Sequence, residues 1–288
     1  MEIVAVALAL ATAATWALVT QLQQKGIQAV DGRTGALIVV LSFAGLFWLL
    51  APFFIEWQWF GTRATVIFII SGFLVPGLAQ QFQMLSVEKL GATFTAIVGA
   101  FAPVFAVVPA VVILKEQLNL QAAIGIALII VGVILSVRAK TRSAGAFSLV
   151  LIWLALGGAA TRGLGQPVSK YGLNELPEPF FATLVMVTSA AVFIGVLHLF
   201  RHRETIRIEV TSKLLWLVAA GMVLGFGFLL LYAALNVGDV VFVAPFIATM
   251  PIWVVLYDHF IFKHDRIGKG QMLSAVVVTL GAVVLVTR

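Results

Sequence analysis

The sequence has no cysteine and few charged residues, and each shortage excludes a class of protein. Without cysteine, the chain has no disulfide framework, no thiolate nucleophile and no cysteine-bound metal. Only 10% of the residues are charged, while 62% are hydrophobic, whereas about a quarter of the residues in a soluble domain carry charge. This composition indicates that most of the chain lies in a lipid bilayer.

Motifs for catalysis and nucleotide binding are also missing. The sequence contains no HExxH, GxSxG or GxxxxGK[ST] pattern, and none of its stretches is polar and long enough to form the nucleotide-binding domain of an ATP-driven pump. The basic residues behind the net charge of +6 are spread over short loops, where they set membrane orientation and do not form a nucleic-acid site. We therefore predict no enzymatic activity, no cofactor, no metal and no nucleic-acid partner.

What the sequence does contain is a series of apolar stretches of about twenty residues, the length that a helix needs to cross a bilayer. Strands of a membrane barrel would be about half as long and would alternate apolar with polar residues, so the stretches predict an all-α membrane protein. We predict ten transmembrane helices, at residues 3–24, 34–55, 64–87, 90–114, 119–137, 147–170, 179–200, 213–235, 240–262 and 268–287.

The chain repeats itself. Residues 13–26 (AATWALVTQLQQKG) and 159–172 (AATRGLGQPVSKYG) share Ala-Ala-Thr and two further identities at one constant spacing. Residues 77–87 likewise align with 227–237. We predict two five-helix repeats, 1–142 and 143–288. Since each holds an odd number of spans, the second copy is expected to be inverted in the membrane. The first span matches an internal segment, so we expect it to be a mature span and not a cleaved signal peptide.

Loop charge predicts the orientation. The loops after the odd-numbered spans hold thirteen of the lysines and arginines, against four on the opposite side. Because basic loops stay in the cytoplasm, we predict an integral protein of the cytoplasmic (inner) membrane with both termini outside. One chain already contains both repeats, so we expect a monomer.

Arg162 is the leading candidate for a functional residue, because it lies inside the predicted span 147–170. An arginine at that depth costs a few kcal/mol and usually faces a bundle interior or a wet cavity. It shares a polar stripe with Gln166, and no acidic residue occurs in its span. The planar guanidinium suits a carboxylate-bearing or phosphate-bearing ligand. The alternative is a structural cation that pairs with helix-end carbonyls or reaches to the interface.

Trp16 occupies the position of Arg162 in the first repeat and lies on a similar stripe with Thr15. The alternative for the threonine is helix packing. Gln80, Gln81 and Gln83 lie in the third span, where at least one amide should hydrogen-bond across helices or to a ligand; the sequence does not tell which one. We predict Trp16, Thr15, Gln80 and Gln83 to bind substrate, together with Arg162 and Gln166.

Phe228 and Tyr232 share one face of the eighth span and could stack on an apolar or aromatic substrate; a packed aromatic pair is an equally good interpretation. Three prolines lie inside predicted spans, where proline removes a backbone hydrogen bond and kinks the helix. Kinked helices at equivalent places in two repeats are typical of a midplane site and its gates. We therefore predict Pro103, Pro251 and Pro167 as hinges.

The order and spacing of several motifs resemble the drug/metabolite transporter superfamily, specifically its ten-helix EamA-type members. The motifs are Ala-Ala-Thr at 13–15 and 159–161, Phe82-Gln83-Met84-Leu85, Tyr232-Ala233-Ala234-Leu235, Pro103 with Lys115-Glu116, and Pro251. The second repeat departs from the pattern, because it has His264 where the first has Glu116. The resemblance implies export or exchange of small metabolites, including amino acids, by alternating access around a central cavity.

We therefore predict a secondary transporter, most simply an exporter, whose substrate bears a carboxylate. The chain lacks a mid-membrane acid, which disfavours proton antiport through a carboxylate and leaves facilitated diffusion or exchange. One alternative is a multidrug or cation exporter of the same superfamily. Another is a membrane-embedded lipid-modifying enzyme, for which only Asp258, His259, His264 and Asp265 approach a reactive cluster.

Overall fold

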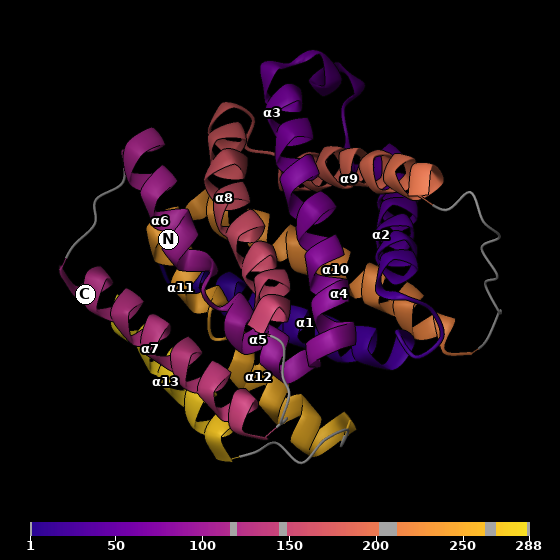
Figure 1. Ribbon diagram of the computed structural model, residues 1–288. Coiled ribbons are helices and arrows are strands. Elements are labelled where there is room, and N and C mark those ends of the chain that lie inside the picture. Colours follow the sequence, from indigo (N-terminus) through magenta and orange to yellow (C-terminus); the bar gives the residue numbers. More distant parts are fainter. Residues whose placement is uncertain (1, 116–119, 144–148, 202–211, 263–268, 287–288) are drawn as a thin grey trace.

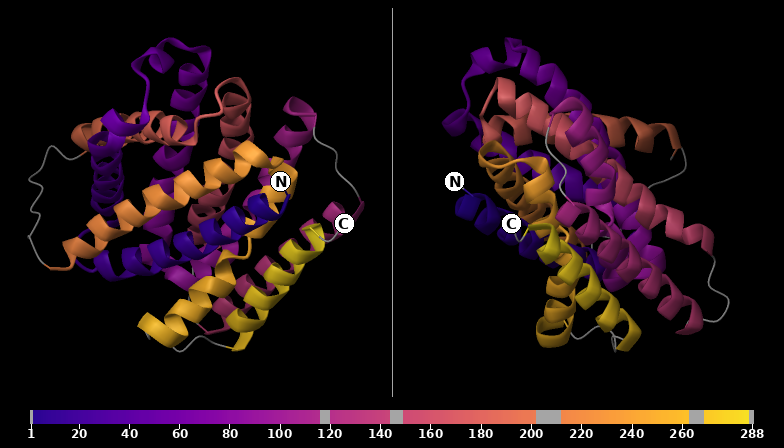
Figure 2. Two further views of the ribbon diagram at one scale, coloured as in Figure 1. Left: turned by 180° about the vertical axis from the view of Figure 1, so that it is seen from behind. Right: turned by 90° about the vertical axis from the view of Figure 1, so that its left-hand side faces the viewer.

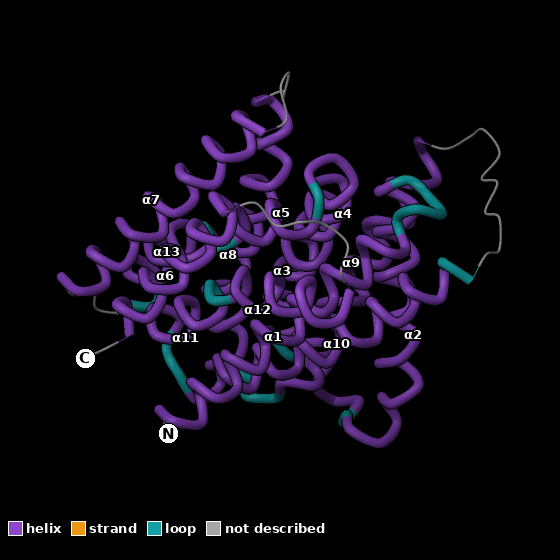
Figure 3. Tube along the Cα trace, turned by 90° about the horizontal axis from the view of Figure 1, so that it is seen from below, coloured by secondary structure: helices purple, strands orange, loops and turns teal. Residues whose placement is uncertain are grey.

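The computed structural model describes residues 2–115, 120–143, 149–201, 212–262 and 269–286, so Glu116, His264 and Asp265 lie outside the described residues. Within these ranges every regular element is helical (Figure 3). Backbone groups in lipid have no water to bond, so apolar runs of this length satisfy them within a helix. The long helices are α1 (Glu2–Gly26), α2 (Gly32–Phe54), α7 (Leu120–Ser143), α8 (Ile152–Glu175), α9 (Pro179–Arg201), α10 (Leu214–Val237) and α13 (Lys269–Val286).

The remaining helices are shorter and follow one another in three groups. The first group is α3 (Arg63–Gly72), the π-helical η2 (Phe73–Leu78) and α4 (Ala79–Leu90). The second is α5 (Ala92–Gly99) and α6 (Ala102–Ile113), and the third is α11 (Val240–Ile247), α12 (Met250–Tyr257) and the π-helical η4 (Asp258–Phe262). Two single turns, η1 (Trp57–Gly61) and η3 (Leu149–Leu151), precede α3 and α8.

Seven helical stretches in the described ranges are long and apolar enough to cross a membrane. They are 3–26, 32–54, 63–90, 92–113, 179–200, 214–237 and 240–262. These seven match seven of the ten predicted spans, and the chain is therefore a multi-pass membrane protein. The other three predicted spans coincide with α7, α8 and α13, of which α8 is less apolar because it carries Arg162 and Lys170. The total of ten spans remains a prediction.

The predicted disturbance of the helix at Pro103 and Pro251 takes the form of a break just before each proline. Each of these spans is two separate helices, α5 then α6 and α11 then α12, and each proline lies in the first turn of the second helix. Proline is tolerated there because the first turn has no backbone acceptor for its missing N–H. The prolines therefore start half-helices and do not bend continuous ones.

The two breaks have the same hydrogen bonds. In the first, Phe101 N donates to Val98 O and Val104 N to Phe101 O, both at 3.0 Å. In the second, Thr249 N donates to Phe246 O at 3.1 Å and Ile252 N to Thr249 O at 3.0 Å. These tight turns occupy backbone groups that would otherwise be unpaired inside the membrane. The duplication seen in the sequence thus extends to backbone geometry.

The third predicted span is also interrupted, at η2. Val75 has non-helical backbone angles (φ −139°, ψ 117°) just before Pro76. A proline disfavours the α conformation in the residue before it, which explains why the helical geometry fails at Val75. The interruption separates α3 from α4, and α4 carries Gln80 and Gln83 on its buried side.

Helix packing follows the duplication. α1 packs along α10, and its counterpart α8 packs against α3 and α4. The last helix of each half meets the other, since α7 and α13 lie side by side (Figures 1 and 2). α2 packs on α9, and the broken pairs meet through α5 with α12 and α6 with α11. Exchanging the two halves of the chain leaves this contact pattern unchanged.

Glycines allow the closest of these contacts. A Cβ atom on Gly163 of α8 would lie 2.3 Å from the Ala102 carbonyl oxygen, and one on Gly221 of α10 would lie 2.3 Å from that of Val39. Small residues permit such backbone approach between membrane helices. The glycine at 163 therefore brings α8, with Arg162, against the break between α5 and α6.

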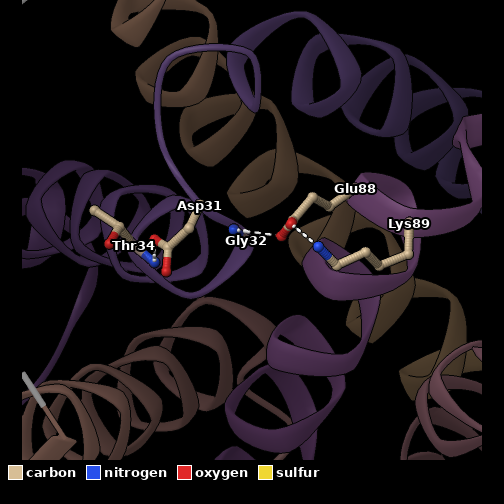
Figure 4. A network of polar contacts seen from close by, with 5 residues as sticks. All are labelled: Asp31, Gly32, Thr34, Glu88 and Lys89. Carbon is tan, nitrogen blue, oxygen red and sulfur yellow. Dashed lines mark hydrogen bonds and ion pairs between the residues drawn. The ribbon is translucent and has the colours of Figure 1, made fainter.

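A polar network at one end of the bundle fixes α4 (Figure 4). Asp31 caps α2 by accepting a hydrogen bond from Thr34 N at 2.9 Å, and Glu88 near the end of α4 accepts one from Gly32 N at 2.8 Å. Lys89 pairs with the same carboxylate. A carboxylate at a helix N-terminus accepts hydrogen bonds from N–H groups that have no partner within the helix. Its negative charge also interacts favourably with the helix dipole. The network joins the start of α2 to the helix that carries the two glutamines.

Candidate binding cavity

Arg162 extends from the middle of α8 toward α4 and α5. Its Nη1 donates a hydrogen bond of 2.9 Å to Oε1 of Gln83, and its Nη2 lies 2.8 Å from the point where a Cβ on Gly99 would stand. The side chain is half-buried. Gln83 is thus the glutamine of the third span that meets the arginine, an alternative that the sequence left open.

The guanidinium has no acidic partner in the described part of the chain. The two ion pairs there are Arg63 with Glu175 and Lys89 with Glu88, both near helix ends. Arg162 instead faces a neutral amide, which uses only one of its five N–H donors. The alternative of a structural cation that binds helix-end carbonyls finds no support in the contacts of this side chain with the described residues, which involve Gln83 and nearby glycines.

Trp16 of α1 lies beside Arg162, as its equivalent position in the repeat suggested. The indole is buried, and its ring lies 5.1 Å from that of Phe228. Its Nε1 has no hydrogen-bond partner among the described residues. Three neighbouring cavities, of about 380, 340 and 220 Å³, are all lined by both Trp16 and Arg162. The two repeats therefore contribute one residue each, from the same repeat position, to one central space.

The largest of the three cavities has a mixed lining. Its polar side chains are Thr20, Gln23, Gln80 and Gln83, together with Arg162. The aromatic rings of Trp16 and Phe228 and several aliphatic residues make up the rest. An apolar lining with a few polar groups is the usual composition of a small-molecule site.

The second cavity lies at the two helix breaks. Gly99 and Pro103 line it from the first break, and Ala248 and Met250 from the second. Gln166 of α8 also lines it, and Oε1 of this buried amide has no partner in the described structure. Discontinuous helices beside a central site are characteristic of transporters built from repeats.

Tyr232 reaches the smallest cavity with its ring, while its hydroxyl is used elsewhere. The hydroxyl and that of Ser169 are 2.9 Å apart, and Ser169 also contacts Ser71 of α3. Tyr232 further donates to the sulfur of Met186. The contacts of the hydroxyl favour packing between α3, α8, α9 and α10, and only the ring is available to a ligand.

The structure therefore brings together seven of the eight predicted binding residues. Arg162, Trp16, Gln166, Tyr232, Gln80, Gln83 and Phe228 each line at least one of the three cavities. Thr15 lines none of them, because its hydroxyl donates to Ala11 O at 2.7 Å and its methyl group faces Gly227. Threonine in a helix commonly bonds the carbonyl four residues earlier.

Of the predicted hinges, Pro103 lines the second cavity, and Pro251 follows Met250 at the second break. Pro167 differs from both, because α8 continues through it to Glu175 and the proline is buried. No break occurs there. Whether any of the three prolines acts as a hinge stays a prediction.

Gln23 is a polar cavity residue that the predicted set omitted, as is Thr20. It lies one helical turn after Thr20 and two after Trp16, so helical spacing already placed it on the same stripe. Its side chain is fully buried at the wall of the largest cavity, and neither amide atom has a hydrogen-bond partner in the described ranges. Val75 and Met250 were also missed, because an apolar residue in an apolar span gives no signal of its own.

A multi-pass helical chain with two similar halves and a cavity between them has the construction of a membrane transporter. The family model of the EamA-like transporter family matches residues 3–138 and again 149–287. The chain belongs to this family, and therefore to the transporters that the sequence motifs resembled.

Comparison with solved structures supports the fold. One matching chain, from the crystal structure of a protein, superposes with a TM-score of 0.69. The match covers 98% of this chain and 96% of the other, at 15% sequence identity, and so shows a shared fold alone. No curated protein matches the sequence at a significant level.

Proposed function

We propose that the protein is a secondary transporter that moves small carboxylate-bearing metabolites, amino acids among them, out of the cell. The observation that carries this proposal is Arg162, a guanidinium that lines all three central cavities and has no carboxylate partner in the described residues. Membership of a transporter family supplies the class of activity, and the arginine supplies the chemistry of the substrate.

A carboxylate would supply the negative charge that the described residues lining the three cavities lack. Its two oxygens accept several hydrogen bonds and match the fork of a guanidinium. Trp16 Nε1, a donor that has no acceptor role, would give a second bond to the same group, and the amide of Gln80 or Gln23 a third. The rings of Trp16 and Phe228 would cover an apolar or aromatic body of the substrate.

The mechanism we propose is alternating access between two five-helix repeats, 1–142 and 143–288, inverted relative to each other across ten spans. The matching contacts of α1 with α10 and of α8 with α3 and α4, and the matching breaks before Pro103 and Pro251, support a pseudo-symmetric pair. Such a pair can expose one central site to each side in turn. Loop charge supports a cytoplasmic-membrane location with both termini outside.

A cation exporter is the second candidate, and the cavity does not favour it. A cationic substrate would approach Arg162 without a carboxylate from the cavity wall to offset the repulsion. A lipid-modifying enzyme would need a reactive cluster, and the described residues contain no group of three histidine, aspartate or glutamate side chains.

Counterflow in proteoliposomes tests the proposal. Purified protein would be assayed with labelled L-phenylalanine, L-leucine and succinate, with L-phenylalaninamide as a matched solute without a carboxylate, and with tetraphenylphosphonium as a cation. We expect saturable counterflow of at least one carboxylate and none of the amide. Movement of the amide and the cation alone would overturn the assignment of substrate class.

A further inference from the structure

We propose that the protein is an exchanger, in which a carboxylate crosses the membrane only when another anion makes the return step. This inference rests on the proposed function, because it requires a carboxylate at Arg162. It adds how transport is coupled, and it makes a second anionic ligand, taken from the opposite side, part of each cycle.

The first observation is the charge of the cavity wall. Arg162 is the only charged residue among the described residues that line the three cavities. Its guanidinium contacts the amide of Gln83 and approaches two glycines, and the indole of Trp16 lines the same cavities. The described lining of a ligand-free cavity therefore holds one positive charge and no negative charge to offset it.

The second observation is where the acids lie. In the described ranges, no aspartate or glutamate lines a cavity. All lie at helix termini or between helices except Asp258, which is buried where α12 runs into η4 within the stretch 240–262. Glu88 and Glu175 are already paired with Lys89 and Arg63. If the helices shift to close one side of the three cavities, no described aspartate or glutamate in the cavity lining is available to pair with Arg162.

The physical consequence concerns occlusion. When a carrier changes sides, its site closes to water for a moment, and a guanidinium that loses water without an opposite charge is costly. A bound carboxylate removes this cost, since it offers the opposite charge and two hydrogen bonds together. The loaded protein should therefore change sides much faster than the empty one, and net transport is slow because every cycle must return through an occupied state.

The test compares uptake by wild-type proteoliposomes with different internal solutes. Vesicles would contain L-phenylalanine, L-phenylalaninamide or sorbitol, with the membrane potential clamped by potassium and valinomycin, and initial uptake of labelled L-phenylalanine would be measured. L-leucine and succinate would be run in the same way. We expect internal carboxylate to raise the initial rate about tenfold or more, and the internal amide to behave like sorbitol.

The possible failures are distinguishable. Equal uptake into carboxylate-loaded and sorbitol-loaded vesicles would overturn exchange while leaving carboxylate transport intact. No protein-dependent movement of any of the three carboxylates, in any vesicles, would overturn the proposed function and the exchange with it.

A substitution beside the arginine tests the charge argument itself. Gln83→Glu places a carboxylate where Oε1 now accepts from Arg162 Nη1 at 2.9 Å, so the empty site gains its own counter-charge. We expect uptake into sorbitol-loaded vesicles to rise toward the exchange rate of the same variant. Gln83→Leu, which removes the hydrogen bond without adding charge, is the matched control and should keep the dependence on internal carboxylate. A Gln83→Glu protein that depends on internal carboxylate as strongly as wild type would contradict the proposal.

Discussion

Gln83 of α4 accepts a hydrogen bond of 2.9 Å from Arg162 of α8, and this contact joins the two repeats at the central cavities through a neutral acceptor. An arginine held by an amide is oriented but keeps its charge available. A carboxylate in the place of Gln83 would instead give the guanidinium an opposite charge within the protein. The proposed carboxylate substrate and the proposed exchange both depend on Arg162 and on its neutral partner Gln83.

Trp16→Phe should weaken binding of a carboxylate substrate while leaving the fold intact. The substitution keeps an aromatic ring against Phe228 and removes only the Nε1 donor, which has no protein partner to lose. Hydrogen bonds to charged groups contribute about 1.5–3 kcal/mol, so we expect the half-saturating concentration in counterflow to rise by about tenfold or more. Trp153→Phe, at a largely exposed position of the same type on α8, is the control. An unchanged half-saturation in Trp16→Phe would remove the indole from the site.

Gly99→Ala should displace the guanidinium of Arg162. The added Cβ would stand 2.8 Å from Nη2, at the flexible end of the arginine side chain, so the arginine moves and the backbone does not. We expect a several-fold rise in half-saturation for carboxylates, because the fork no longer meets both oxygens in the same geometry.

Gly45→Ala is the matched control for that variant, since a Cβ at Gly45 meets nothing within 4 Å. It should leave counterflow unchanged. Equal effects of the two substitutions would show that loss of helix flexibility, and not the position of the arginine, determines the result.

Tyr232→Phe should lower stability more than substrate affinity. The hydroxyl is bonded to Ser169 and Met186, and only the ring faces a cavity. Removing the hydroxyl leaves Ser169 short of a buried partner, and we expect the free energy of unfolding to fall by about 1–2 kcal/mol. Thermal unfolding in detergent would detect this, with Tyr171→Phe, at an exposed position of α8, as the control. A large change in half-saturation with unchanged stability would reverse the assignment and make the hydroxyl a ligand group.

Much of the architecture was accessible from the sequence, because an apolar run of twenty residues has few alternatives to a membrane helix. That Trp16 and Arg162 line one space could also be predicted, since they occupy the same position in the two repeats and each lies on a polar stripe of its span. The break positions were accessible in part, because Pro103 and Pro251 mark where each span is disturbed. The form of the break was not, since a helix that stops at Gly99 and resumes at Ala102 stays apolar throughout and local turns occupy its backbone groups.

The site residues divide in a similar way. Polar side chains such as Gln80 and Gln166 are conspicuous in a membrane span, so the sequence identified them. Thr15 was assigned to the cavity because threonine is polar, but its hydroxyl bonds its own helix. Gln83 and Gln80 could not be ranked from spacing alone, because the break at Val75 changes which face of α4 points inward. Tertiary structure decided these cases.

The most direct test of the central claim, that Arg162 binds the carboxylate of a transported metabolite, is counterflow of the labelled carboxylates with wild type and Arg162→Gln side by side. Equal amounts of folded protein, verified by thermal unfolding, would be reconstituted. We expect wild type to show saturable carboxylate counterflow, and the variant to lose it or to need at least about tenfold more substrate. A folded Arg162→Gln protein that transports carboxylates with wild-type half-saturation would contradict the account and leave the arginine a structural role.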